Sequence, residues 1–97
     1  MITTKQRASL RALAHGLTPV VIIGKDGLTE NVVSSINDAL EARELIKIKL
    51  LSTCDIPTRE ISNKVCEKLG ADGIQCIGSV VVLYKKSNKE NVEHILI

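Results

Sequence analysis

The strongest candidate for ligand binding in this chain is a short loop made of Gly24, Lys25, Asp26 and Gly27. It follows the apolar run 19–23 and precedes a helix-like stretch. Glycine has no side chain and tolerates positive φ, so a loop with glycine at both ends lets another backbone approach closely. Free N–H groups at the start of the following helix would attract an anion, and Lys25 would add a mobile positive charge. The loop is therefore a candidate phosphate site, and its alternative role is that of a plain turn.

Few other residues are spaced for catalysis or metal binding. The histidines, His15 and His94, have neither a nucleophile nor a carboxylate at a recognisable motif spacing. The three cysteines lack C-x-x-C spacing and are typical of reduced, mostly buried thiols. The glycine loop also lacks the longer G-x-x-x-x-G-K-[ST] frame of a nucleotide P-loop. We therefore expect no enzyme activity, cofactor, metal or small-molecule substrate.

Composition narrows the class of protein further. A chain of 97 residues, 44% hydrophobic and 25% charged, is typical of one soluble domain. Tyr84 is the only aromatic residue, which argues against binding that stacks bases on aromatic side chains. The net charge of +2 is too small to indicate a nucleic-acid partner unless basic residues cluster. The sequence has no signal-peptide pattern and no run of transmembrane length, so we expect a cytoplasmic monomer without a membrane partner.

Hydrophobic periodicity divides the chain into alternating helices and strands. It predicts helices from Thr3 or Thr4 to about Gly16, from Thr29 to about 41, and from after Pro57 to Gly70, with strands over 20–23, 46–50, 74–77 and 80–84. Gly78 and Ser79 suit a type II′ hairpin turn. Of the tail, residues 85–89 should be solvated, and 92–97 should add a short strand or pack on the body. The order α-β-α-β-α-β-β predicts one compact α/β domain with a mixed sheet of about four strands and helices mainly on one face.

Basic residues could extend the loop into a larger surface. The first helix should place Leu10, Leu13, Ala14 and Leu17 inward, with Thr4, Arg7, Arg11 and His15 on a separate polar stripe. The uninterrupted apolar run 20–23 predicts a strand that is covered on both faces. Alternation over 46–50 exposes Lys47 and Lys49 on one side of their strand. If the first helix packs beside the glycine loop, Lys5, Arg7 and Arg11 would join Lys25 and these lysines. Ordinary solubilising charges are the alternative, and spacing alone leaves both open.

Separated motifs resemble the YhbY-like family of CRM-domain RNA-binding proteins. They are Leu13-Ala-His-Gly-Leu-Thr-Pro-Val-Val21, Ile23-Gly-Lys-Asp-Gly-Leu-Thr-Glu-Asn-Val32, Glu44-Leu-Ile-Lys-Ile-Lys49, and Ile77-Gly78 with Val82-Leu-Tyr84. The resemblance implies a single CRM domain over residues 1–97, with a fold similar to the C-terminal domain of bacterial translation initiation factor three. It also implies binding to structured ribosomal RNA of large-subunit precursors. By the family motif, Gly24, Lys25 and Gly27 correspond to the RNA-contacting loop, and Lys47 to a basic strand position.

These observations lead to one main hypothesis. It is a non-enzymatic RNA-binding protein that acts in assembly of the large ribosomal subunit and clamps the RNA backbone rather than reading bases. The expected RNA-binding residues are Gly24, Lys25, Asp26, Gly27, Lys5, Arg7, Arg11 and Lys47. A protein-interaction module of the assembling ribosome, with the glycine loop as a plain turn, is the alternative. A small DNA-binding protein is a third possibility.

Overall fold

Helices and strands alternate in the predicted order. The computed structural model describes residues 2–89, 94 and 95, and these contain three helices and four strands. They are α1 (Thr4–Ala14), β1 (Val21–Ile23), α2 (Glu30–Arg43), β2 (Leu45–Leu50), α3 (Thr58–Leu69), β3 (Asp72–Ile77) and β4 (Val80–Tyr84). The strand or packed segment considered for 92–97 falls mostly outside the described residues.

The strands form one mixed sheet in the order β1-β2-β4-β3. β1 is parallel to β2, whereas β4 is antiparallel to both of its neighbours. The predicted hairpin joins β3 to β4, with Ile77 opposite Val80. In its turn Gly78 has a φ of 54° while Ser79 stays out of the left-handed region, as a type II′ turn requires. The fold class predicted from the sequence is confirmed.

Two local helix signals also have the expected geometry. Thr3 caps α1, because its hydroxyl accepts the Gln6 N–H at 3.0 Å while the Gln6 side chain accepts the Thr3 N–H at 2.9 Å. Thr29 caps α2 by accepting the Val32 N–H at 3.1 Å. The second cap fixes where α2 begins, and therefore where the loop that follows β1 must end.

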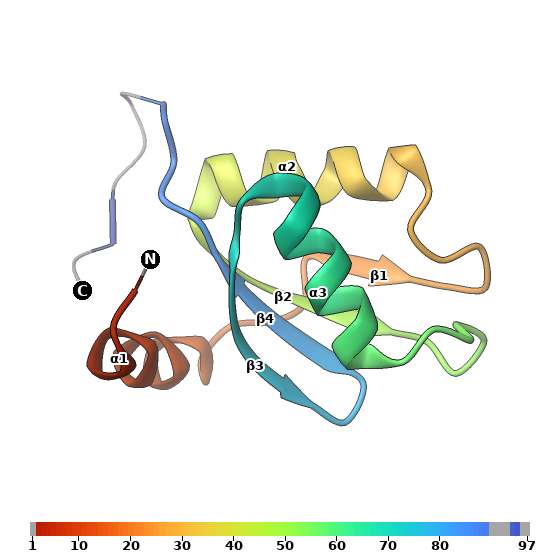
Figure 1. The fold of residues 1–97 in the computed structure, drawn as a ribbon, viewed down its shortest axis with the longest axis horizontal. Helices are drawn as coiled ribbons and strands as arrows, with labels where there is room; N and C mark the ends of the chain where they lie inside the picture. The colour runs from red at the N-terminus through yellow and green to blue at the C-terminus, as the bar shows by residue number, and fades with distance from the viewer. Residues whose placement is uncertain (1, 90–93, 96–97) are drawn as a thin grey trace.

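Helices cover the two faces of the sheet unequally (Figure 1). α2 and α3 pack over one face and enclose the main core, formed by Val21, Ile23, Ile36, Leu40, Ile46, Ile48, Leu50, Ile61, Val65, Val81 and Leu83. α1 lies on the other face, where Leu10 and Ala14 pack on a smaller cluster formed by Leu45, Ile74, Val82 and Tyr84. This second face is therefore covered at one end only.

Two predictions about buried faces are wrong for a shared reason. The strand over 20–23 was expected to be covered on both faces, yet Ile22 is 59% exposed. β1 is an edge strand, and its outward side lies beyond the reach of α1. Leu13 was expected to point inward from α1, yet it is 51% exposed. α1 packs through Leu10 and Ala14 and leaves Leu13 at its side. Hydrophobic periodicity identified the apolar residues, but it did not show how much of each sheet face the helices cover.

The segment after β4 is held against the C-terminal end of α2. Glu44 is fully buried, and its carboxylate accepts the N–H groups of Ser87 at 2.6 Å and Ile95 at 2.7 Å. The same carboxylate lies 2.6 Å from Nδ1 of His94. Ser87 is also buried and donates its hydroxyl to the Glu41 carbonyl at 2.6 Å. The expectation that residues 85–89 are simply solvated is therefore wrong at Ser87.

This arrangement predicts a pH-dependent contribution of Glu44 to stability. Burial opposes ionisation, but hydrogen bonds from His94, Ile95 and Ser87 hold the pKa of Glu44 below its usual 4.5. Because the folded-state pKa is the lower one, the ionised carboxylate stabilises the fold above the unfolded pKa, and this contribution is lost as pH falls through the folded pKa. Glu44→Gln should therefore lower the free energy of unfolding at pH 7 but have a shrinking effect below about pH 4.5.

Urea denaturation over a pH series measures this difference. Glu67→Gln on α3 removes an exposed carboxylate and controls for the loss of one surface charge. A destabilisation by Glu44→Gln that stays constant down to acidic pH would contradict the assigned role of the carboxylate.

Candidate nucleic-acid interface

The glycine loop is a closed turn between β1 and α2. The Gly27 N–H donates to the Gly24 carbonyl at 3.1 Å, and the Thr29 N–H donates to the Gly27 carbonyl at 3.1 Å. Lys25 and Asp26 are exposed, whereas Gly27 is buried and has a φ of 67°. The loop thus presents the side chains of Lys25 and Asp26 to solvent directly before the capped start of α2.

A second loop lies against the glycine loop. β1 and β2 run parallel with Ile23 opposite Leu50, so the segments that follow them leave the same edge of the sheet. The Leu51 N–H donates to the Ile23 carbonyl at 2.9 Å. A methyl group built on Gly27 would lie 3.1 Å from Cδ1 of Ile56. Within residues 24–29 and 51–57, all of them described, Lys25 is the one basic residue. These two loops therefore cannot supply a large positive field.

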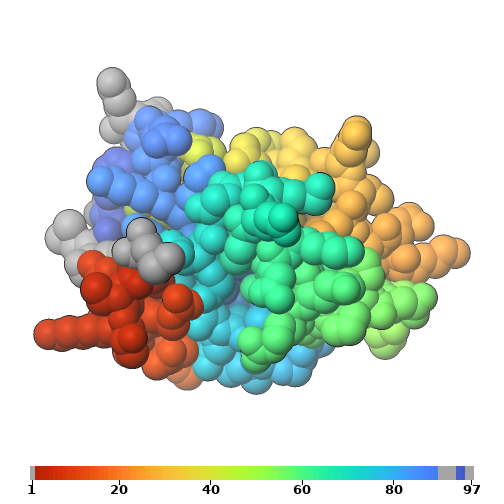
Figure 2. Space-filling model, viewed as in Figure 1, coloured from red at the N-terminus to blue at the C-terminus, as the bar shows by residue number. Residues whose placement is uncertain are grey.

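α1 does not pack beside the glycine loop, which corrects the expected single basic surface. It rests on the end of the sheet where β2 begins, because Leu45 and its neighbours form the apolar part of that face. α1 and the glycine loop lie at opposite ends of the longest dimension, which spans 35 Å (Figures 1 and 2). Lys5 and Arg7 are consequently remote from Lys25. The Arg7 guanidinium instead donates to the Gly73 carbonyl, at a bulge in β3.

Beyond α1, the same sheet face is open, and we call this open part the bare sheet face. One row across it joins Ile22, Lys49, Val80 and Ile77, and a second joins Val20, Lys47, Val82 and Gln75. Lys47 and Lys49 are half-buried, whereas Ile22 and Ile77 at the flanks are each 59% exposed. Lys49 Nζ donates to Ser79 Oγ at 2.5 Å. The face is therefore a mixture of aliphatic and positively charged side chains.

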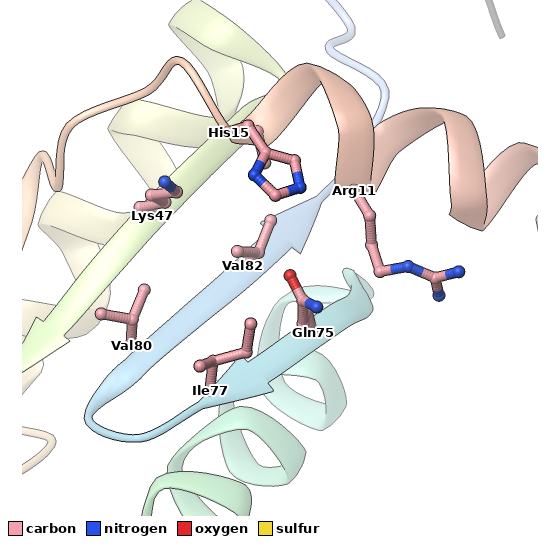
Figure 3. A pocket seen from close by; sticks show the side chains of 8 residues that line it. Arg11, His15, Lys47, Gln75, Ile77, Val80 and Val82 are labelled. Carbon is pink, nitrogen blue, oxygen red and sulfur yellow. The ribbon is translucent and has the colours of Figure 1, made fainter.

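A cavity of about 190 Å³ lies where α1 meets the bare sheet face (Figure 3). It is lined by Arg11, Ala14, His15, Lys47, Gln75, Ile77, Val80 and Val82. The structure thus brings Arg11 and Lys47 together, although not on the single surface with Lys25 that the sequence suggested. Sequence reasoning missed Gln75 and gave His15 no functional role. A spacing of two residues places Gln75 and Ile77 on one face of β3, but nothing in the sequence indicated that this face adjoins Lys47, because β4 lies between β3 and β2.

Other chemistry has little support in the described part of the chain. Among residues 2–89, 94 and 95, no group of three His, Cys, Asp or Glu side chains could hold a metal ion. Cys54, Cys66 and Cys76 are free and half-buried. Burial raises the pKa of the Cys66 thiol, which favours its protonated, unreactive form. None of the helices in the same residues has the length and apolar character needed to cross a membrane.

Comparisons with known proteins agree on one family. Residues 2–85 match the family model described as CRS1/YhbY (CRM) domain. The chain is 42% identical over 91 residues to the "Probable RNA-binding protein YqeI" of Bacillus subtilis, with 94% of each chain covered. It is 38% identical over 92 residues to an "RNA-binding protein" of Haemophilus influenzae, covering 95% of this chain and 93% of that one.

A plant protein and a solved structure extend the comparison. The chloroplastic "CRS2-associated factor 1" of Arabidopsis thaliana is 32% identical over 66 residues, which are 68% of this chain but 9% of the plant protein. The solution structure of the hypothetical protein SAV1595 from Staphylococcus aureus superposes with a TM-score of 0.79 at 38% identity. It covers 98% of this chain and 100% of that one.

The two loop glycines should respond differently to substitution. Gly27→Ala should lower the free energy of unfolding by about 1 kcal/mol or more, because a side chain is strained at positive φ and its Cβ would press on Ile56. Gly24→Ala should change it by less than about 0.5 kcal/mol, because its Cβ would make ordinary contacts at 3.7 and 3.9 Å. Urea denaturation measures both values, and equal losses would contradict the loop geometry.

Proposed function

The chain belongs to the CRS1/YhbY (CRM) domain family, and from that premise we propose that it is a non-enzymatic RNA-binding protein. Its proposed partner is structured ribosomal RNA of large-subunit precursors. The relatives' names support RNA as the class of ligand. The resemblance of the motifs to YhbY-like proteins supports the ribosomal assignment.

One observation about Gly24 carries the proposal. Gly27 needs to be glycine for reasons of fold, since its φ is positive and Ile56 occupies the space of a side chain. Gly24 has neither restriction, because its φ is not positive and an added Cβ would have normal contacts. A glycine that the fold does not require fits a site where another molecule's backbone comes close. The exposed Lys25 beside it supplies the charge for a phosphate.

The bare sheet face is the proposed source of the remaining positive charge. Ile22 and Lys49 lie directly before the two loops, so the face adjoins the glycine loop along β1 and β2. Lys47 lies further from the loops along β2. Arg11, on α1, lies at the end of the bare sheet face that is furthest from the loops. An RNA strand that contacts the loop and crosses the sheet would meet these cations in turn. This path binds phosphates and RNA shape rather than a base sequence.

The remaining residues that the sequence suggested for RNA binding have smaller roles in the proposed complex. Lys5 is exposed on α1 and would contact only an RNA that extends past Arg11. The guanidinium of Arg7 donates a hydrogen bond to the Gly73 carbonyl. We therefore assign Arg7 mainly to supporting the fold and not to binding RNA. Asp26 adds negative charge to the loop tip and therefore limits its affinity for phosphate.

A protein-interaction module is the alternative, and the exposed aliphatic side chains of Ile22 and Ile77 favour it. Binding to purified, protein-free ribosomal RNA separates the two functions, because an interaction module would not be retained. Competition between RNA and DNA of equal length tests the third possibility, a DNA-binding protein.

Reversing the charge of the loop should weaken RNA binding. Lys25→Asp should reduce affinity for ribosomal RNA by about tenfold or more, since an attractive phosphate contact becomes repulsive. Lys68→Asp makes the same charge change in the last turn of α3, on the helix-covered side of the sheet, and serves as the matched control. Filter binding measures both variants. Equal effects would indicate non-specific electrostatics and contradict a role for the loop.

The affinity should also depend on salt in a defined way. If about four to six phosphates are neutralised, log K should fall against log salt with a slope of about −3 to −5. Lys25→Asp should make this slope shallower by about one unit, because one phosphate contact is lost. Titrations at increasing KCl give the slope for each protein. An affinity that is independent of salt would contradict backbone clamping.

A further inference from the structure

The cavity between α1 and the bare sheet face has the size of a small planar group. Its volume of about 190 Å³ is below the range of about 300–1,000 Å³ that is typical of sites for drug-sized ligands. Its floor is aliphatic and comes from Ile77, Val80 and Val82 on two neighbouring strands. An apolar floor of this size suits one ring system and excludes a whole dinucleotide cofactor.

Two flat side chains line the cavity from the side of α1. His15 directly follows α1, and Figure 3 shows its ring above Val82, whereas the Arg11 guanidinium extends to the side, away from Val80 and Ile77. Arginine guanidinium planes and histidine rings are among the groups on which RNA-binding proteins stack splayed bases. This matters here because Tyr84, the only aromatic residue of the chain, is 6% exposed and does not line the cavity. Base stacking therefore does not require Phe, Tyr or Trp at this site.

The polar groups of the cavity fit a nucleotide rather than an apolar ligand. Lys47 offers a charge for the phosphate at one side, together with Arg11 at the other (Figure 3). The side-chain amide of Gln75 points into the space between them and can both donate to and accept from the edge of a base. No carboxylate lines the cavity. The charge is thus complementary to a polyanion.

We propose that this cavity binds a single unstacked nucleotide of the bound RNA, with its base between the aliphatic floor and the ring of His15 and its phosphate near Arg11 and Lys47. The proposal rests on the RNA-binding function above and adds a base-contacting site to the backbone clamp. Its ligand is a nucleotide in a single-stranded or bulged part of a structured RNA, because a base inside a duplex cannot enter.

The experiment compares two probes that differ only in their bases. One is octauridylate RNA, and the other is a ribose-phosphate oligomer of the same length without bases. The double variant His15→Ala/Gln75→Ala should bind octauridylate about fivefold or more weakly than the unmodified chain, as the loss of one stacked base implies. Its affinity for the baseless oligomer should stay within about twofold. Lys25→Asp should weaken both complexes, because it removes a phosphate contact.

Each other result has a defined meaning. If the double variant loses affinity for both probes equally, or for neither, the cavity does not hold a base and the proposal is overturned while RNA binding stands. If the double variant binds both probes normally but loses a ribosomal protein, the occupant is a protein, which also overturns it. If the unmodified chain binds neither probe nor ribosomal RNA, the proposed function fails with it. Matching circular dichroism spectra and melting curves confirm that the variant is folded.

Discussion

Strand β2 must place neighbouring side chains in opposite environments, and this constraint determines how the domain is layered. Ile46, Ile48 and Leu50 are buried beneath α2 and α3, so Lys47 and Lys49 necessarily point to the other face. Burying an unpaired ammonium group costs far more free energy than one aliphatic contact contributes. The second face can therefore be covered only where β2 carries Leu45, and there α1 packs. The rest of this face stays open because apolar residues and lysines alternate along β2.

The parallel pairing of β1 with β2 has a separate consequence. It sends the loops that follow β1 and β2 out of the same end of the sheet, where Ile56 packs into the space that Gly27 leaves empty. The two loops thus pack against each other, and the exposed Lys25 lies at the tip of the first. If the glycine loop binds RNA as proposed, a loop held in this way would lose little conformational freedom on binding. The fold therefore contributes preorganisation as well as position.

The local elements could be predicted from the sequence because their signals lie within a few residues of each other. Thr29 as a cap, the Gly78 turn and the alternation of β2 are of this kind. The cover over each face could not be predicted, since the apolar platform for α1 exists only after β2, β3 and β4 have paired. For the same reason the exposure of Ile22 was missed. The cavity could not be foreseen either, because its lining comes from α1, β2, β3 and β4 together.

The small net charge of +2 is compatible with binding a polyanion because the charges are separated in space. Two carboxylates, those of Glu41 and Glu44, are engaged with the chain segment after β4 and lie away from the bare sheet face. Asp26 is exposed at the tip of the glycine loop, away from the cavity. The cations of the cavity have no carboxylate among them. A ligand would therefore be attracted mainly to the sheet and positioned by the loop, so the two parts of the surface have complementary tasks.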